Sequence, residues 1–169
     1  MQHCLENYPK IALKYYFQIQ KIIDTNYKEF VGPITELRPW QEIVINKINN
    51  QNDRQILFVI DEDGNKGKST LIKHLVSSQD AWACTGGKVT DLMTAYDTDA
   101  KIAIFDMARS NPNNYWSWSM MENLKNGIFT TTKYKGMMKQ FTPPKVVVFT
   151  NKNVPRDKFS MDRYDVYFI

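Results

Sequence analysis

Residues 56–76 read ILFVI-DEDGNKGKST-LIKHLV, and this stretch decides the fold. The order of an apolar run, a glycine-containing turn and a second apolar segment predicts a strand at 55–60, a phosphate-binding loop and a helix at 68–78. Glycines let backbone N–H groups turn inward around an anion, and the following helix adds its N-terminal donors and positive dipole end. We expect a nucleoside triphosphate to bind the loop residues Gly64, Asn65, Lys66, Gly67, Lys68, Ser69 and Thr70.

Within this loop, Lys68 is expected to reach the outer phosphates and the Ser69 hydroxyl to hold Mg²⁺. The usual spacing G-x-x-x-x-G-K-[ST] requires a glycine at position 62, where this chain has Glu62. With Asp61 and Asp63 it forms a carboxylate triplet beside the expected phosphates. Like charges about 4 Å apart repel by about 4 kcal/mol near a protein surface, so these acids should point outward or be bridged by a metal. The alternative is an acidic turn that carries Gly-Lys-Ser-Thr by chance.

Length and composition favour one globular domain, with at most a small appendage. The chain has 169 residues, of which 43% are apolar, and its net charge of +4 permits nucleic-acid binding without requiring it. Its two cysteines are isolated and it has two histidines, which argues against a disulfide framework or a structural zinc site and fits a reducing intracellular compartment. No apolar run approaches a membrane span, and we expect no membrane partner and no secretion signal.

The rest of the pattern alternates strands and helices. Further strands are predicted at 81–85, 101–106, 128–133, 145–150 and 164–169, and further helices at 9–24, 39–50, 88–96 and 115–126. The runs at 56–60, 102–105 and 146–149 are continuously apolar, as in strands buried on both faces of a parallel sheet. We therefore predict an α/β fold with a central, mainly parallel sheet flanked by helices. Residues 1–50 would form a helical segment and residues 51–169 the core.

Two predicted strands end in polar residues suited to phosphate chemistry. Asp106 follows an apolar run and could hold Mg²⁺ beside the loop, although an aspartate starting a turn is common. Asn151 could contact the γ-phosphate or the attacking water, because an amide both donates and accepts, and the order of the motifs favours this role over the alternative of a strand-terminating turn former. Met107 stands where a second carboxylate often orients water. Glu122 is the substitute, and an exposed helical glutamate explains it as well.

Later in the chain, basic residues surround an aromatic one. Lys133 and Lys135 flank Tyr134, a pattern suited to single-stranded nucleic acid, where charges follow the backbone and the ring stacks on a base. A solvated hairpin tip is the alternative. Arg156 and Arg163 are candidates for an arginine finger that reaches a neighbouring subunit's nucleotide, with Arg163 preferred. Either could instead be an ordinary solvated arginine.

The ordered set of motifs resembles the superfamily 3 helicase domain of replication initiator (Rep) proteins of circular single-stranded DNA viruses, in its nanovirus and alphasatellite form. The match is carried by GNKGKST at 64–70, IFD at 104–106, ENLKNG at 122–127 with Lys133-Tyr134, VVFTN at 147–151 with SMDR at 160–163, and YPKIALKY at 8–15. It spans nearly the whole chain.

The resemblance implies a P-loop NTPase (AAA+-like) fold and an ATP-driven 3′-to-5′ DNA helicase that works as a homo-oligomeric, usually hexameric, ring in the host nucleus. By position, Lys68 and Ser69 bind ATP and Mg²⁺, Asp106 binds Mg²⁺ and Asn151 senses the γ-phosphate. Lys133 and Lys135 grip single-stranded DNA, and Arg163 serves the adjacent subunit. Glu62 and Met107 depart from the pattern and bear on turnover. Such proteins also carry a nicking domain with a His-hydrophobe-His site; no His-x-His occurs here, so nicking is not expected.

Two other functions fit parts of the sequence. One is a DNA-binding assembly module that binds ATP with little or no turnover, which the departures in the loop motivate. The other is a monomeric P-loop kinase, for which no lid with paired arginines is visible.

Overall fold

The computed structural model describes residues 6–19, 36–107, 116–131 and 136–169. It divides the chain into two compact units, Met1–Val31 and Gly32–Ile169. In the first unit, helix α2 spans Pro9–Lys14 and has proline in its first turn, as predicted. Tyr15 leaves the helical conformation, and residues 16–19 are helical again. The predicted helix at 9–24 is therefore interrupted where a run of three aromatic residues of lower helix propensity begins; residues 20–24 lie outside the described residues.

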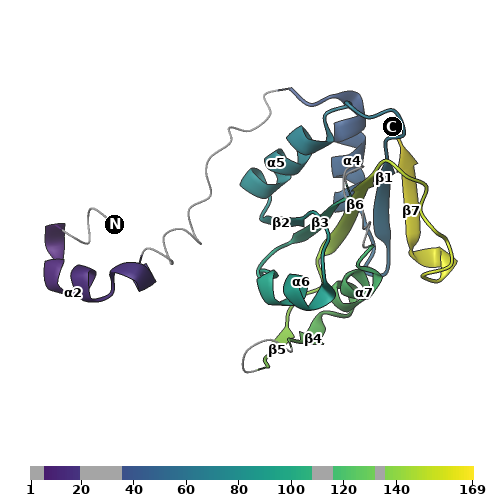
Figure 1. The fold of residues 1–169 in the computed structure, drawn as a ribbon. Helices are drawn as coiled ribbons and strands as arrows, with labels where there is room; N and C mark the ends of the chain where they lie inside the picture. Colours follow the sequence, from purple (N-terminus) through teal and green to yellow (C-terminus); the bar gives the residue numbers. More distant parts are fainter. Residues whose placement is uncertain (1–5, 20–35, 108–115, 132–135) are drawn as a thin grey trace. The chain divides into compact units, whose positions relative to one another are not determined.

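The second unit is built on a parallel five-stranded sheet (Figure 1). Its strand order is β2-β3-β6-β1-β7, and every neighbouring pair is parallel. The strands are β1 (Ile56–Ile60), β2 (Ala81–Cys84), β3 (Ile102–Met107), β6 (Lys145–Thr150) and β7 (Tyr164–Phe168). All five were predicted within one residue at each end. The continuous apolar runs of β1, β3 and β6 arise because both faces of these central strands are covered, and the predicted α/β fold is confirmed.

Helices cover the two faces of this sheet as two layers (Figure 1). Helices α4 (Pro39–Asn49) and α5 (Lys68–Ser78) share one core with Leu57 and Val59. Helices α6 (Val89–Ala95) and α7 (Trp118–Asn126) share the other with Phe58 and Ile60. Successive β1 side chains thus enter opposite cores, as strand geometry requires. Because α4 packs on the sheet, residues 39–49 belong structurally to the second unit.

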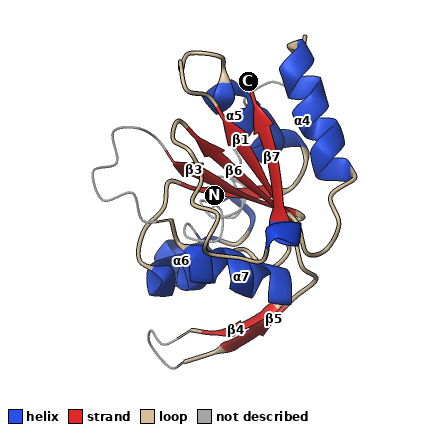
Figure 2. Cartoon of the chain, turned by 90° about the vertical axis from the view of Figure 1, so that its right-hand side faces the viewer, coloured by secondary structure: helices blue, strands red, loops and turns tan. Residues whose placement is uncertain are grey.

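A short antiparallel hairpin lies beyond α6 and α7 (Figure 2). It consists of β4 (Ile128–Thr130) and β5 (Met138–Gln140). The sequence predicts a strand at 128–133 but not β5, which is short and mostly polar. The Lys139 ammonium donates to the carbonyls of Met93, Thr94 and Tyr96 at 2.8–3.2 Å. This lysine satisfies carbonyls at the C-terminal end of α6 and fixes the base of the hairpin to that helix.

A buried lysine joins α7 to the edge of the sheet at which the parallel strands begin. The Lys125 ammonium donates to Gln51 Oε1 at 2.9 Å and to the Pro144 carbonyl at 3.3 Å. The Gln51 amide pairs with both backbone groups of Val146, at 2.8 and 2.9 Å. Burial lowers the pKa of Lys125 to about 8; the positive charge of Lys145 acts in the same direction. This lysine therefore carries its charge in the folded protein at a cost.

We predict that the free energy of unfolding gains a favourable contribution from Lys125 as pH rises from about 8 towards 10.5. Over this window the unfolded chain keeps the lysine proton and the folded chain loses it, so the unfolded state binds more protons. Urea unfolding between pH 7 and 10 measures this. Lys125→Met should show a shallower rise than the wild type, whereas Lys73→Met, at an exposed site on α5, should follow it. Equal slopes for Lys125→Met and wild type would contradict the prediction.

Candidate functional site

The predicted phosphate loop lies between β1 and α5. Its backbone has positive φ at Gly64 (87°), Asn65 (61°) and Gly67 (88°). Such left-handed residues turn successive N–H groups to one side, which makes an anion-binding concavity. Gly67 is the N-cap of α5, and no side chain caps this helix or places a negative charge in its first turn. The end of α5 therefore offers its N–H donors and positive dipole end to an outside anion.

Lys68 faces a carboxylate of its own loop. Its ammonium lies 2.5 Å from Asp61 Oδ2, and the Gly64 N–H donates to Asp61 Oδ1 at 2.7 Å. The Asp61 side chain has no exposed surface. Burial acts to raise the pKa of Asp61, but the hydrogen bonds from Lys68 and Gly64 outweigh it and hold that pKa below its usual value. The expectation that all three loop acids point outward or bind a metal was wrong for Asp61, because a lysine rather than a metal neutralises it.

The ends of β3 and β6 complete the edge of the sheet beside this loop. Asp106 pairs in register with Phe149, and Met107 with Thr150, which also pairs with Ile60 at the end of β1. The Asn151 amide donates to the Asp61 carbonyl. Burial raises the pKa of Asp106, and the charge of Lys68 opposes this.

Lys68, Asp106 and Asn151 therefore meet at the carboxyl edge of the parallel strands, where α/β sheets bind ligands. Ser69 and Thr70 are exposed in the first turn of α5.

Three residues that sequence reasoning missed hold the loop from the side of α4. Arg38 and the Trp40 indole both donate to the Lys66 carbonyl, at 2.9 and 3.1 Å. The Gln41 amide donates to the Gly67 carbonyl at 3.3 Å. These hydrogen bonds hold the Lys66 and Gly67 carbonyls on the α4 side of the loop, so the loop N–H groups can face the concave side, where an anion would bind. The sequence predicts α4 only as a packing helix, because nothing local marks a contact across 26 or more residues.

Within this chain, Arg163 lies at the edge where the parallel strands begin, away from the predicted phosphate loop. It ends the 3₁₀ turn η1 (Met161–Arg163) just before β7, whose first residue Tyr164 pairs with Ile56, the first residue of β1. The phosphate loop follows the last residue of β1. Arg163 Nη1 lies 3.6 Å from Glu122 Oε1. Arg163 and Glu122 are therefore brought together, but not with Lys68; a role of Arg163 towards another subunit stays a prediction. Lys133, Tyr134 and Lys135 lie outside the described residues.

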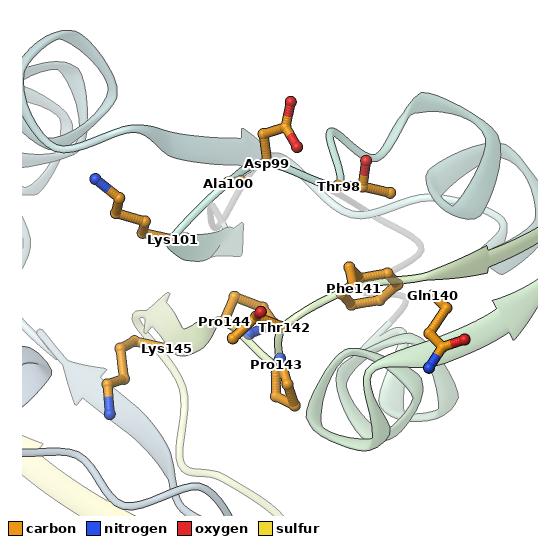
Figure 3. A pocket seen from close by; sticks show the side chains of 10 residues that line it. All are labelled: Thr98, Asp99, Ala100, Lys101, Gln140, Phe141, Thr142, Pro143, Pro144 and Lys145. Atoms are coloured by element: carbon orange, nitrogen blue, oxygen red, sulfur yellow. The ribbon is translucent and has the colours of Figure 1, made fainter.

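A separate pocket of about 610 Å³ opens among the loops that lead into β3 and β6 (Figure 3). It is lined by Thr98, Asp99, Ala100, Lys101, Gln140, Phe141, Thr142, Pro143, Pro144 and Lys145. These loops precede the strands, so the pocket lies at the amino edge of the sheet. None of the predicted nucleotide-binding residues lines it, and it is not the site described above.

Among the residues that the structure describes, no group of three or more His, Cys, Asp or Glu side chains could hold a metal ion. No helix in the described ranges is both long and apolar enough to span a bilayer.

Comparison with known proteins gives one consistent result. Residues 58–152 match the RNA helicase family, a stretch that runs from β1 past Asn151. The chain is 35% identical over 126 residues to the master replication protein of Milk vetch dwarf virus, covering 75% of this chain and 43% of that protein. It is 36% identical over 133 residues to Para-Rep C6 of Subterranean clover stunt C6 alphasatellite, covering 76% and 46%. A third relative, the master replication protein of Banana bunchy top virus, is 32% identical over 129 residues, covering 76% and 44%.

The chain thus spans less than half the length of these relatives. The matched region contains the phosphate loop and the ends of β3 and β6, so the shared sequence includes the site as well as the core. The chain belongs to the RNA helicase family, and its relatives include master replication proteins of viruses and a Para-Rep protein of an alphasatellite.

Proposed function

We propose that this chain is the superfamily 3 motor domain of a viral replication initiator, hydrolysing ATP to translocate along single-stranded DNA. The observation that carries the proposal is the meeting of four features at one sheet edge. They are the positive-φ loop, the uncapped start of α5, Lys68, and the strand-end residues Asp106 and Asn151. Together they offer donors for phosphate oxygens, a carboxylate for a metal and an amide for the terminal phosphate.

Each residue has a role in this scheme. The loop amides from Gly64 to Gly67 and the Lys68 ammonium bind the phosphates, and Asn151 contacts the γ-phosphate or the attacking water. Ser69 and Asp106 would hold Mg²⁺, which neutralises charge on the phosphates. The residues fit this ion, because both ligand atoms are oxygens. Asp106 is also half-buried, and burial disfavours the charged form of its carboxylate, so a bound cation would stabilise that charge.

The group that activates water is not supplied by the residue after Asp106. Met107 follows it and is buried. Glu122 pairs with Arg163 at the opposite end of β1 from the loop, so it is not placed to serve the nucleotide of its own chain. We infer that the chains assemble into a ring in which a neighbouring subunit completes each site. Arg163 or Arg156 would then act as the arginine finger that reaches the neighbour's nucleotide.

Single-stranded DNA is the proposed substrate track. The basic segment at Lys133–Lys135 connects the two strands of the β4–β5 hairpin in the sequence, and Lys139 anchors the base of that hairpin to α6. The alternative function is an assembly module that binds ATP with little turnover. One observation favours it: the Lys68 ammonium already forms an ion pair with the Asp61 carboxylate.

DNA-dependent hydrolysis separates these two functions. We expect single-stranded DNA to raise the rate of phosphate release from Mg-ATP, and native mass measurements with an ATP analogue and a short single strand to show a DNA-bound oligomer. Rings that bind DNA and ATP without hydrolysis would support the assembly module instead.

Lys133→Ala should lower the slope of log affinity for DNA against log salt by about one unit, because one phosphate contact is lost.

A further inference from the structure

We propose that Asp61 is a resident anion of the phosphate loop, one that occupies the loop in place of a nucleotide phosphate and thereby sets the affinity for nucleotide. The inference rests on the proposed function, since it assumes that the loop is a nucleotide site. Asp61 is the first residue after β1, and its side chain is completely buried. It points into the loop.

The contacts of Asp61 are of the kind that a phosphate makes. One carboxylate oxygen accepts a loop amide, the Gly64 N–H, at 2.7 Å, and the other accepts the Lys68 ammonium at 2.5 Å. A nucleotide phosphate in a P-loop takes the same two donor types, backbone N–H groups and the loop lysine. The loop therefore has a satisfied anion without any ligand.

A phosphate entering the loop must compete with this carboxylate. The phosphate needs Lys68, and it brings negative charge next to a buried negative group whose only ion-pair partner in the described structure is that same lysine. A buried charge that loses its partner is strongly unfavourable. Binding therefore requires Asp61 to give up Lys68 and to turn away, take up a proton or meet another cation, and each of these costs affinity.

At the end of β6, the Asn151 amide donates to the backbone carbonyl of Asp61. Asp61 is therefore linked to both the lysine that binds phosphate and the amide proposed to sense it.

Asp63 provides a matched comparison two residues away. Its side chain is 82% exposed and pairs with Lys66 at 3.2 Å, on the outside of the loop. Removing its charge changes the net charge of the loop as much as removing that of Asp61. A purely long-range effect of charge would make the two variants similar, whereas occupancy of the loop by Asp61 makes them different.

The test compares the affinity of wild type, Asp61→Asn and Asp63→Asn for a fluorescent non-hydrolysable ATP analogue, with Mg²⁺ and with EDTA. Asparagine keeps the size of Asp61 and the acceptor for Gly64 but removes the charge that holds Lys68. We expect at least about tenfold tighter binding by Asp61→Asn in both conditions, and a change of less than about twofold for Asp63→Asn. Asp61→Gly, which removes the side chain altogether, gives the same expectation should Asp61→Asn unfold.

Equal or weaker binding by folded Asp61→Asn and Asp61→Gly, while the wild type binds, would overturn the role of Asp61 and leave the proposed function intact. Weakening seen only with Mg²⁺ would make Asp61 a metal ligand, which also overturns it. Failure of the wild type and of every variant to bind the analogue, with cooperative thermal unfolding retained, would remove the proposed nucleotide site and the inference together.

Discussion

Lys68→Ala is expected to reduce ATP hydrolysis by about 10²- to 10³-fold. The ammonium is the charged donor that stabilises the negative phosphate oxygens, and removal of one preorganised donor to developing charge typically costs this much. Steady-state phosphate release with and without single-stranded DNA measures the loss. Lys73→Ala, five residues further along α5 and exposed, should retain wild-type turnover.

The structure makes a second control necessary for this variant. Lys68 neutralises the buried Asp61, so Lys68→Ala alone leaves a buried carboxylate without its partner and should lower stability. The double variant Lys68→Ala with Asp61→Asn removes both charges and should recover stability but not hydrolysis. Hydrolysis restored in the double variant would show that Lys68 acts on Asp61 rather than on the nucleotide, contrary to the proposed mechanism.

Asp106→Asn is expected to lower the maximal rate of hydrolysis by about 10²-fold or more and to raise the Mg²⁺ concentration needed for half-maximal rate. Charge neutralisation by a bound metal is worth several kcal/mol to the transition state, and an amide is a poorer ligand than a carboxylate. The rate as a function of Mg²⁺ at saturating ATP measures both effects. The fold should persist, because burial already disfavours the charged form of Asp106.

Asp99→Asn is the matched comparison, since Asp99 is exposed in the loop before β3. It should leave the Mg²⁺ dependence unchanged. An Asp106→Asn enzyme with a wild-type rate and unchanged Mg²⁺ dependence would remove this carboxylate from the site.

The sequence predicts the part of this protein that local patterns encode. The apolar runs of β1, β3 and β6 are long, uninterrupted and bounded by turn residues, so their positions and their burial on both faces follow from the chain alone. The loop sequence predicts a strand-turn-helix, and parallel topology then brings Asp106 and Asn151 to the same edge as Lys68. The fold and the outline of the site follow from these elements.

The remaining features depend on contacts between distant residues or on the choice of one side chain among several. Strand β5 is too short and polar to show a period. The hydrogen bonds from Arg38 and Trp40 to the loop join segments 26 or more residues apart. Asp61 points inward because a lysine seven residues later neutralises it, a pairing that the triplet of acids does not reveal. Arg163 lies beside Glu122 because β7 runs parallel to β1, which sets the start of β7 at the end of the sheet opposite the loop.

Calorimetric titration of the protein with Mg²⁺ and a non-hydrolysable ATP analogue tests the nucleotide site most directly. We predict saturable binding that approaches one nucleotide per chain in assembled protein and is lost in the Lys68→Ala, Asp61→Asn double variant. Absence of binding heat in folded, assembled wild-type protein at saturating analogue would contradict the account, and the loop between β1 and α5 would then be a structural turn.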